Sequence, residues 1–415
     1  MRLSAWLCML CLLAVPYAFA TAAPDDAALA HARVLLQSTI LLDGHNDLPW
    51  SIRADSKAPM DVDAYDLRTR TSGETDLVRL KQGQLRAQFW SIFVPGETQE
   101  GYAKVQLEQF DIARRMIAKY PEAMELALSA SDVRRIAAKG KVASLLGMEG
   151  GHVLENSLGA LRAYYDLGAR YMTLTHNVTL DWADAAMDEP RHHGLTPFGK
   201  EVVREMNRLG MLVDISHVSP AVMRDALDVS AAPLIFSHSS AYALVEHVRN
   251  VPDAILKRMA ENGGVVMVTF VPPFVNRHAQ AWDAGLERQS KGIADDAQRN
   301  RLEQAYSKEH GPSPQATLKD VADHIDYVAK VAGHDHVGIA SDFGGSPTPV
   351  GLEDVSKYPD LFAELIRRGW SDADLEKLAG ENMLRTFEQA ERVAKRLQKE
   401  RPPSTATIAA LDGKQ

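Results

Sequence analysis

Cysteine is almost absent from this 415-residue sequence: the two that occur, Cys8 and Cys11, lie within the first twenty residues. These residues combine a charged start, a largely apolar run over residues 3–15 and small residues up to Ala20. This combination predicts a secretory signal peptide over residues 1–22. The mature chain would then contain no cysteine, so it could form no disulfide even in the periplasmic or extracellular compartment to which we expect export.

Long apolar runs and basic tracts are also missing. The leading apolar run is shorter than the roughly 20 residues that a membrane-spanning helix needs, so we expect no transmembrane segment in the mature chain. The sequence has 46 Lys+Arg against 55 Asp+Glu, a net charge of −9, with no Lys/Arg-rich stretch, which argues against nucleic acid as a partner. With 46% hydrophobic and 24% charged residues, the composition is that of a globular protein.

Apolar, strand-like runs alternate with helix-like segments from residue 35 onward, and this alternation indicates parallel βα units. Helix starts agree, because Thr196-Pro197 and Ser219-Pro220 each place a capping hydroxyl before a proline at the first helical position. The sequence therefore predicts an α/β fold, a (β/α)8 or TIM barrel. The strand-like runs are Thr39 to His45, Leu85 to Val94, Val142 to Glu149, Arg170 to His176, Met211 to His217, Pro233 to His238, Gly264 to Phe270 and Val337 to Asp342.

We expect a single domain over residues 23–400, since no low-complexity segment interrupts this alternation. Two stretches do not fit a bare βα unit, residues 51–83 and 272–312, and we interpret both as insertions into the barrel. The second is polar and charged and is expected to be partly helical. Residues 401–415 are expected to form a loose tail.

Titratable side chains end six of the eight strand-like runs. In such a barrel the chemistry gathers at the carboxyl ends of the strands, so we expect these side chains to meet at one rim. Strand periodicity alone does not require a His, Asp or Glu at these positions. The residues are His45 with Asp47, Glu149, His176, His217, His238 and Asp342.

Five of these residues fit a site for two metal ions. Alternation along the chain places His45 and Asp47 on the same side, and imidazole and carboxylate donors suit zinc, with Mn or Co as substitutes. Five ligands are too many for one tetrahedral site with an open position, but they fit two ions that share a carboxylate. Glu149 is the expected bridge, because it lies in chain order between that pair and the two later ligands, His217 and His238. Taken singly, each residue is better explained by a structural role.

Three other residues have open interpretations. Asp342 is either a structural aspartate or a group that moves protons beside the metals, and its place on the last strand favours the second. His176 could polarise a substrate oxygen without binding metal. On sequence grounds alone Arg249 would be an ordinary surface arginine. His334-Asp335-His336 precedes the last strand and is therefore expected at the opposite face of the barrel, away from the site.

Longer motifs surround these residues: His45-Asn46-Asp47-Leu48-Pro49-Trp50, Gly147-Met148-Glu149-Gly150-Gly151-His152, Tyr171-Met172-Thr173-Leu174-Thr175-His176, Ser216-His217-Val218-Ser219, Phe236-Ser237-His238-Ser239-Ser240-Ala241-Tyr242, Arg249-Asn250-Val251-Pro252-Asp253 and Gly351-Leu352-Glu353-Asp354-Val355-Ser356-Lys357-Tyr358-Pro359-Asp360-Leu361. Together, from about Leu35 to Glu391, the chain resembles the membrane dipeptidase (renal dipeptidase) family of zinc peptidases, as a bacterial-type secreted member.

The resemblance implies an amidohydrolase-type barrel that hydrolyses dipeptides by a hydroxide bridging two zinc ions. It also implies tolerance of a D-residue at the second position and, in some members, hydrolysis of a β-lactam. Similar proteins are often dimers, so a homodimer is expected on this ground. Carried over residue by residue, the resemblance assigns one zinc to His45, Asp47 and Glu149, the other to Glu149, His217 and His238, the substrate carbonyl oxygen to His176, the substrate carboxylate to Arg249, and proton transfer to Asp342.

The chain departs from the family pattern in places. It lacks the hydrophobic carboxyl tail and the cysteines of the glycolipid-anchored mammalian relatives, and the usual Asp-Phe-Asp after the last strand is here Asp342-Phe343-Gly344. Two rival functions stay open: another barrel amidohydrolase, acting on lactones, β-lactams or N-acyl amino acids, and a non-catalytic protein that binds metal or peptide. Glu149 favours the dipeptidase, because many barrel relatives bridge their metals with a modified lysine instead.

Overall fold

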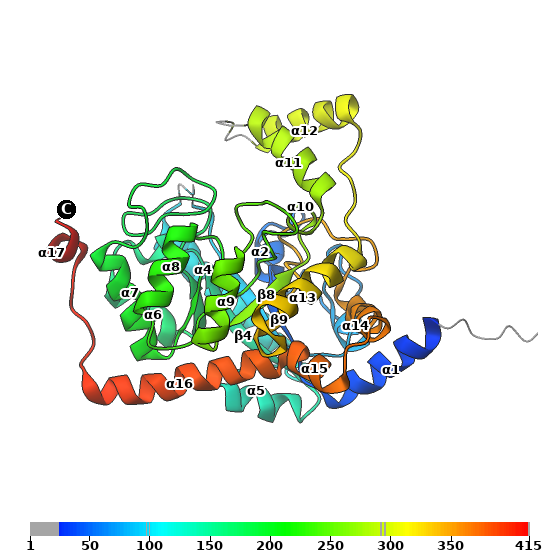
Figure 1. Ribbon diagram of the computed structural model, residues 1–415, viewed down its shortest axis with the longest axis horizontal. Helices are drawn as coiled ribbons and strands as arrows, with labels where there is room; N and C mark the ends of the chain where they lie inside the picture. Colours follow the sequence, from blue (N-terminus) through cyan, green and yellow to red (C-terminus); the bar gives the residue numbers. More distant parts are fainter. Residues whose placement is uncertain (1–24, 97, 99, 291–292, 294–295, 414–415) are drawn as a thin grey trace, which may run out of the picture.

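The computed structural model describes residues 25–96, 98, 100–290, 293 and 296–413 (Figure 1). The signal peptide predicted over residues 1–22 lies outside the described residues. Among the described residues, no helix is both long enough and apolar enough to cross a membrane.

A closed barrel of eight parallel strands forms the centre of the molecule, which confirms the predicted (β/α)8 fold. Neighbouring strands pair all the way round, and β1 (Leu41–Asn46) pairs with both β2 (Leu85–Phe93) and β9 (Val337–Ala340), while β2 also pairs with β4 (Val142–Glu149). The other barrel strands are β5 (Ala169–Thr173), β6 (Leu212–Asp214), β7 (Ile235–Phe236) and β8 (Val265–Thr269).

The sequence did not predict β3 (Met124–Leu126), a short strand outside the barrel that pairs with the first residues of β4. Four barrel strands end two or three residues earlier than predicted. β5, β6, β7 and β9 end at Thr173, Asp214, Phe236 and Ala340, and the chain then turns out of the sheet at the rim. The missing residues are those that carry the titratable side chains, so these side chains lie on loops.

Helices surround the barrel, and two of them begin as predicted. The hydroxyls of Thr196 and Ser219 accept the backbone N–H groups of Gly199 and Val222, with proline at the first helical position. The helices around the strands are α4 (Tyr102–Lys119), α5 (Ala130–Ala137), α6 (Leu158–Asp166), α7 (Pro197–Leu209), α8 (Pro220–Val229), α9 (Asp253–Asn262), α13 (Leu318–Ala332), α14 (Tyr358–Arg367), α15 (Asp372–Glu376) and α16 (Asn382–Glu400), together with α1 (Asp25–Ser38), α2 (Leu48–Arg53) and α3 (Leu77–Gln82).

The barrel is closed at its amino-terminal end. A buried apolar cluster combines interior strand side chains such as Phe89 and Met267 with Ile136 from α5 and Leu384 and Phe387 from α16. In Figure 1, α16 runs along the lower edge of the molecule with α5 beside it. Because this end is packed shut, the opposite rim is the end of the barrel that is open to a ligand.

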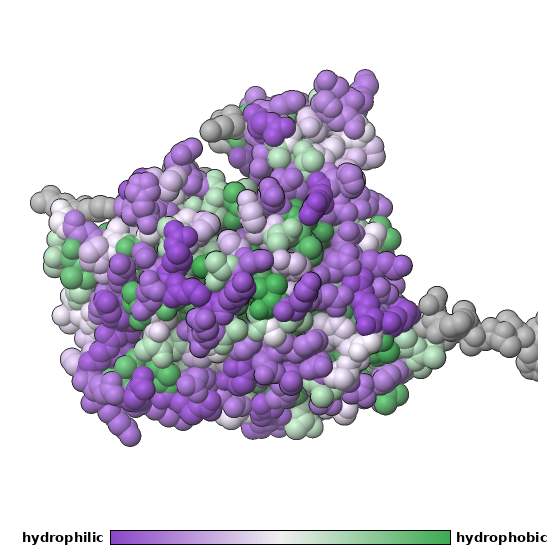
Figure 2. Space-filling model, in the orientation of Figure 1, coloured by the Kyte–Doolittle hydropathy of each residue, from purple (hydrophilic) through white to green (hydrophobic). Residues whose placement is uncertain are grey.

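The insertion expected over residues 272–312 is helical. It forms α10 (Pro272–Val275), α11 (Arg277–Ser290) and α12 (Asp296–His310), and α11 and α12 project from the barrel as a hairpin (Figure 1). Figure 2 shows this projection covered mainly by hydrophilic residues. The insertion over residues 51–83 contains α3, and its buried Arg79 binds Asp76 within the insertion and Asp354 in the segment before α14.

The carboxyl-terminal segment differs from the loose tail that the sequence suggested. It contains a short helix, α17 (Ile408–Asp412), whose Thr407 accepts the backbone N–H of Ala410. The Asp412 carboxylate accepts the backbone N–H of Phe198 at the start of α7, and the backbone N–H of Ser404 binds Glu205. These contacts hold the segment against α7, and they join residues too far apart in sequence for local patterns to predict.

Candidate metal centre and active site

The predicted site residues lie together at the carboxyl-terminal rim of the barrel. A cavity of about 340 Å³ opens there, and all of the predicted residues except His45 line it. His45, at the end of β1, is fully buried just beneath the cavity floor. Residues from six strands or the loops after them therefore converge, as strand-end placement predicted.

Two groups of donor atoms share Glu149. One consists of His45, Asp47 and Glu149 and the other of Glu149, His217 and His238, and within each group the donor atoms lie within 4.8 Å of one another. Glu149 Oε2 is 3.4 Å from His45 Nε2, whereas Oε1 is 3.1 Å from His217 Nε2 and 3.4 Å from His238 Nε2. Each carboxylate oxygen thus faces a different group.

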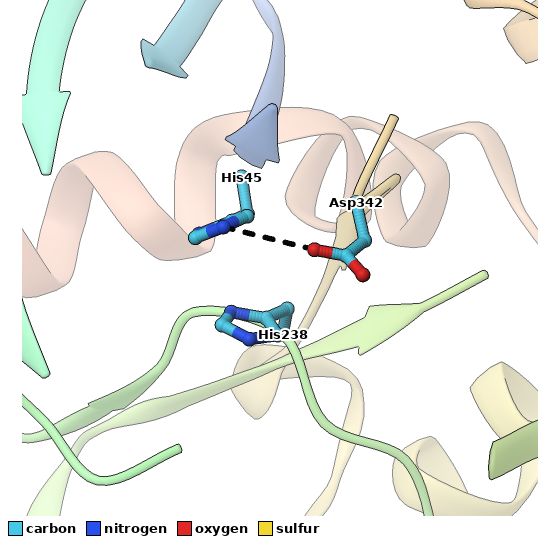
Figure 3. A group of neighbouring side chains, drawn as sticks. All are labelled: His45, His238 and Asp342. Carbon is cyan, nitrogen blue, oxygen red and sulfur yellow. Dashed lines mark ion pairs between the residues drawn. The ribbon is translucent and has the colours of Figure 1, made fainter. Parts of the chain in front are cut away.

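Asp342 lies at the edge of both groups. Figure 3 shows His45, His238 and Asp342 gathered together, His45 at the end of β1 and the other two on the chain that follows β7 and β9. Asp342 Oδ1 is 3.6 Å from His45 Nε2, and the three side chains also satisfy the spacing of a metal-binding group. Their geometry alone is compatible with Asp342 as a proton carrier or as a ligand.

The backbone is unusual at two of these positions. His217 and Asp342 have φ values of 65° and 60°, in the left-handed region that side chains other than glycine seldom occupy. Such conformations cost roughly 1–3 kcal/mol and persist where the surroundings enforce them, often at functional sites. Both residues follow the end of their strands, and both side chains line the cavity.

The donor set fits a bound cation. His45 Nδ1 lies 2.8 Å from the Tyr171 hydroxyl, but its Nε2, which faces Asp47 and Glu149, is buried and has no hydrogen-bond partner in the described part of the chain. His217 Nε2 and His238 Nε2 lie 2.8 Å apart, which brings two ring nitrogens together without an intervening acceptor. A buried nitrogen with no partner is costly, and a metal ion among these atoms would satisfy all of them.

The charge states of Glu149, His217 and His238 suit metal binding as well. Burial, aided by the positive charge of Arg249, lowers the pKa values of His217 and His238 well below the ordinary value for histidine, so both rings are neutral at pH 7. Burial alone would raise the pKa of Glu149, but His45 and His217 outweigh it and hold that pKa well below its ordinary value. Neutral imidazoles and an ionised carboxylate are the forms that bind a metal ion. His45 differs: burial would lower its pKa, but Tyr171, Glu149 and Asp47 outweigh burial and raise that pKa well above the ordinary value, so a metal ion must displace a proton from this ring.

Two other groups at the rim have displaced pKa values. Burial, together with the carboxylates of Asp47 and Glu149, raises the pKa of Asp342 to about 8 against the opposing effect of His45. Its carboxyl group can therefore gain and lose a proton near neutral pH. Burial lowers the pKa of Arg249 to about 10, which leaves the guanidinium charged at pH 7.

Arg249 is not the surface residue that its sequence context suggested. Its side chain is only 1% exposed, and its guanidinium lies 3.4 Å from the Ser239 hydroxyl and 3.4 Å from the carbonyl oxygen of His238, with the Phe274 ring 5.4 Å away. The carboxylates of Glu149, Asp342 and Asp214 act on it from a distance, and none forms an ion pair with it among the residues that the structure describes. A buried cation without an anionic partner, on the wall of a cavity, is suited to bind an anion.

His176 and His152 have different surroundings. His176 lines the cavity, stacks edge-on against Phe93, and has its Nε2 3.9 Å from Glu149 Oε1, so it lies beside the donor groups. His152 packs against Tyr102 and has its Nε2 2.9 Å from the carbonyl oxygen of Val94, and burial lowers its pKa to about 4. His334–His336 forms a short helical turn before β9, at the far end of that strand, as expected.

Sequence reasoning missed two buried aspartates beside the metal-binding groups. Asp43 lies in β1 two residues before His45, and Asp214 ends β6 three residues before His217. Both are fully buried, and both accept hydrogen bonds from the loops that carry site residues. The sequence did hold a signal: each aspartate lies on a strand just ahead of a ligand histidine. A serine precedes Asp342 or His238 after the neighbouring strand of the barrel.

A (β/α)8 barrel with carboxylates and imidazoles converging on a cavity at its carboxyl-terminal rim belongs to the class of metal-dependent barrel hydrolases. The protein family described as membrane dipeptidase (Peptidase family M19) matches residues 29–401, so the chain belongs to this family. Its members are metallopeptidases, and the chain is accordingly a metal-dependent dipeptidase, as the sequence resemblance implied.

Solved structures agree with this assignment. A probable dipeptidase, PvdM, from Pseudomonas aeruginosa is 28% identical, with a TM-score of 0.78 over 89% of this chain and 100% of that one. A metallopeptidase from Rhodobacter sphaeroides, liganded with a phosphinate mimic of the dipeptide L-Ala-D-Ala, is 24% identical, with a TM-score of 0.70 over 85% of this chain and 99% of that one. At 24% identity, the similarity to the Rhodobacter structure shows the shared fold.

Proposed function

We propose that this chain hydrolyses dipeptides, including those with a carboxyl-terminal D-residue, at a centre of two zinc ions bridged by Glu149. His45, Asp47 and Glu149 hold one ion, and Glu149, His217 and His238 hold the other. The observation that carries the proposal is the division of the Glu149 oxygens between two groups of donors, 3.4 Å from His45 on one side and 3.1 Å from His217 on the other. A single ion would need only one of these groups, whereas each of the two groups offers three donor residues.

When bound, the two ions supply a water molecule of lowered pKa and polarise the carbonyl group of the peptide bond. The chain's own residues then determine which substrate fits. The charged guanidinium of Arg249 binds the carboxylate of the dipeptide, because a planar fork of N–H donors matches two carboxylate oxygens. Arg249 lines the same cavity as Glu149, so a bound carboxylate places the peptide bond near the donor groups.

His176 and Asp342 act on the reacting atoms. His176 lines the cavity and donates a hydrogen bond to the carbonyl oxygen as negative charge develops there, an effect worth about 2.7–4 kcal/mol for one donor. Asp342 accepts the proton of the attacking water and delivers it to the leaving amine.

Two further parts of the proposal, the acceptance of a carboxyl-terminal D-residue and the export of the chain, rest on other observations. The Rhodobacter metallopeptidase of the same fold holds a mimic of a dipeptide that ends in a D-residue. The amino-terminal sequence, with its charged start and short apolar run, supports export to the periplasm or the exterior. The assembly to test is a homodimer, which is common among similar proteins.

The test is a count of bound zinc followed by hydrolysis assays on the same sample. The panel contains L,L and L,D dipeptides, an N-acyl amino acid and a β-lactam, each with and without a chelator. We expect two zinc ions per chain and turnover of both dipeptide classes that stops on chelation and returns with added zinc. Turnover of the N-acyl compound or the β-lactam alone would favour another amidohydrolase activity. Two bound ions without any turnover would indicate a binding protein.

A further inference from the structure

Two carboxylates take no part in the proposed mechanism although they lie directly beneath the metal-binding groups. Asp43 and Asp214 are both 0% exposed. A buried carboxylate is costly unless several hydrogen bonds satisfy it. Each of these two accepts four, and the donors come from the strand that bears the aspartate and from neighbouring segments.

Asp43 joins the end of β1 to the loop after β9. Its Oδ1 accepts the backbone N–H groups of His45 at 3.1 Å and Ser341 at 2.8 Å. Its Oδ2 accepts the hydroxyls of Ser341 and Tyr358, each at 2.5 Å. The backbone N–H of Asp342 in turn binds the carbonyl oxygen of His45 at 3.1 Å. One carboxylate thus fixes the backbones that carry His45 and Asp342.

Asp214 joins the loops after β6 and β7 in the same manner. Its Oδ1 accepts the backbone N–H groups of Ser216 at 3.0 Å and Ser237 at 2.9 Å. Its Oδ2 accepts the hydroxyls of Thr173 at 2.5 Å and Ser237 at 2.6 Å. Ser216 immediately precedes His217, and Ser237 immediately precedes His238. This carboxylate therefore fixes the backbones of both ligands of the second donor group.

Asp214 also controls a proton on His238. The Ser237 hydroxyl lies 2.6 Å from Asp214 Oδ2 and 2.8 Å from His238 Nδ1. A hydroxyl has one hydrogen, and the carboxylate can only accept, so that hydrogen points to Asp214. Ser237 must then accept from His238 Nδ1–H, which leaves the lone pair of His238 on Nε2, the atom that faces Glu149. This is the tautomer that binds metal.

We infer that Asp43 and Asp214 are positioning residues, each of which holds one part of the metal centre: Asp43 fixes His45 and Asp342, and Asp214 fixes His217 together with the metal-binding tautomer of His238. The inference rests on the two-zinc centre of the proposed function and not on the identity of the substrate. In Asp214→Asn an amide nitrogen or oxygen replaces each carboxylate oxygen, so one of the two accepting positions is lost. The Ser237 hydrogen is then free to turn toward His238 Nδ1 and place the ring proton on Nε2.

The experiment measures zinc binding in the absence of substrate, by competition with a chromogenic chelator. We expect Asp214→Asn and Ser237→Ala each to lower the binding affinity for one of the two zinc ions about 10- to 100-fold. The affinity for the other ion should stay unchanged. The double variant should bind the affected ion no more weakly than the weaker single variant, because the two residues act in series. Asp43→Asn should lower the binding affinity for the other zinc ion. The kcat of each single variant should recover at saturating zinc.

Asp76→Asn is the matched control, because Asp76 is also a buried carboxylate but caps α3 and binds Arg79 away from the site. It should lower the thermal midpoint of the metal-free protein without changing zinc affinity. The inference is overturned if Asp214→Asn and Ser237→Ala lower that midpoint while both zinc affinities stay at the wild-type values. Should Asp214→Asn fail to fold, Ser237→Ala decides alone. Wild-type zinc binding without dipeptide turnover would instead contradict the proposed function and leave this inference standing.

Discussion

Arg249 shows how much of a residue's role depends on its surroundings. The same side chain that would be unremarkable at the surface is here a cation at 1% exposure, held by a hydroxyl and a carbonyl oxygen. Neither neutral oxygen balances its charge. The group is therefore prepared for an anion, and the carboxylate of a dipeptide is the anion that the cavity beside Glu149 admits.

The first prediction concerns Arg249→Lys. Lysine keeps the charge but offers no planar pair of donors, so the KM for dipeptides should rise about tenfold or more, equivalent to about 1.4 kcal/mol, while zinc content stays unchanged. Steady-state kinetics and metal analysis on the same preparation measure both quantities. A dipeptide amide, which lacks the carboxylate, is the control and should give similar KM values for the variant and the wild type. Equal KM values for the free dipeptide would contradict this role.

The second prediction separates the two interpretations of Asp342. If it carries the proton, Asp342→Asn should lower kcat about 10²- to 10⁴-fold with little change in KM and with both zinc ions retained. If it is instead a ligand, as its spacing from His45 and His238 would allow, zinc affinity should fall as well. Single-turnover kinetics together with zinc titration distinguish the two. Retained zinc with unaltered kcat would exclude both roles.

The sequence predicted the titratable residues but not the groups that support them. His45, Glu149 and Asp342 were predictable because a charged or basic side chain at the end of an apolar run is unusual in itself. Asp43 and Asp214 lie in or at the end of strands and depend on hydrogen bonds across the sheet to Ser341 and Ser237, partners that become visible only once the strand order is known. Arg249 was misjudged for the same reason, since its burial results from the folding of a loop.

Strand ends show a similar limit at the level of elements. Apolar patterning located all eight barrel strands, but it extended β5, β6, β7 and β9 by two or three residues, because the chain stays buried where it leaves the sheet and enters the loops at the rim. A strand ends where its ladder hydrogen bonds end, and the apolar pattern alone does not mark that residue. The helix starts were predicted accurately, because a capping hydroxyl before a proline acts locally.

Gly147 in β4 provides the third prediction. It pairs with Tyr171 of β5, and a Cβ atom at this position would come within 2.0 Å of the Tyr171 ring. Gly147→Ala should therefore displace Tyr171, whose hydroxyl lies 2.8 Å from His45 Nδ1. We expect a loss of about 1–3 kcal/mol in the free energy of unfolding, together with weaker zinc binding.

Chemical denaturation and zinc titration test this prediction, with Gly159→Ala as the control. Gly159 lies exposed in the first turn of α6, where the nearest neighbour of an added Cβ is the hydroxyl of Ser157 at 3.3 Å. Alanine there should leave zinc binding unchanged and should maintain or slightly raise stability, since alanine favours a helix by up to about 1 kcal/mol over glycine. Unaltered zinc binding in Gly147→Ala would show that Tyr171 does not orient His45.

At the scale of the whole molecule, the packing that closes the barrel also buries histidines outside the metal centre. His152, His247 and His324 are each less than 8% exposed, and burial lowers the pKa of each to about 4. His324 has a further constraint, because its Nδ1 accepts the backbone N–H of Ala241 and cannot do so once protonated. The folded chain therefore holds these rings neutral under conditions in which the unfolded chain would protonate them.

The fourth prediction is a loss of stability in acid, measured on the metal-free protein. Above pH 6.5 these histidines are neutral in both states and do not affect the balance. Between pH 6.5 and about 4 the unfolded chain binds protons that the folded chain excludes. The free energy of unfolding should therefore decrease as the pH is lowered, by up to about 3 kcal/mol for each histidine. His324→Asn keeps an acceptor for Ala241 but does not titrate, so denaturation series over this range should give it a shallower slope than the wild type. His278→Asn is the control, because His278 is exposed, and this variant should have the slope of the wild type. Equal slopes in all three proteins would mean that His324 is protonated in the folded chain as readily as in the unfolded one.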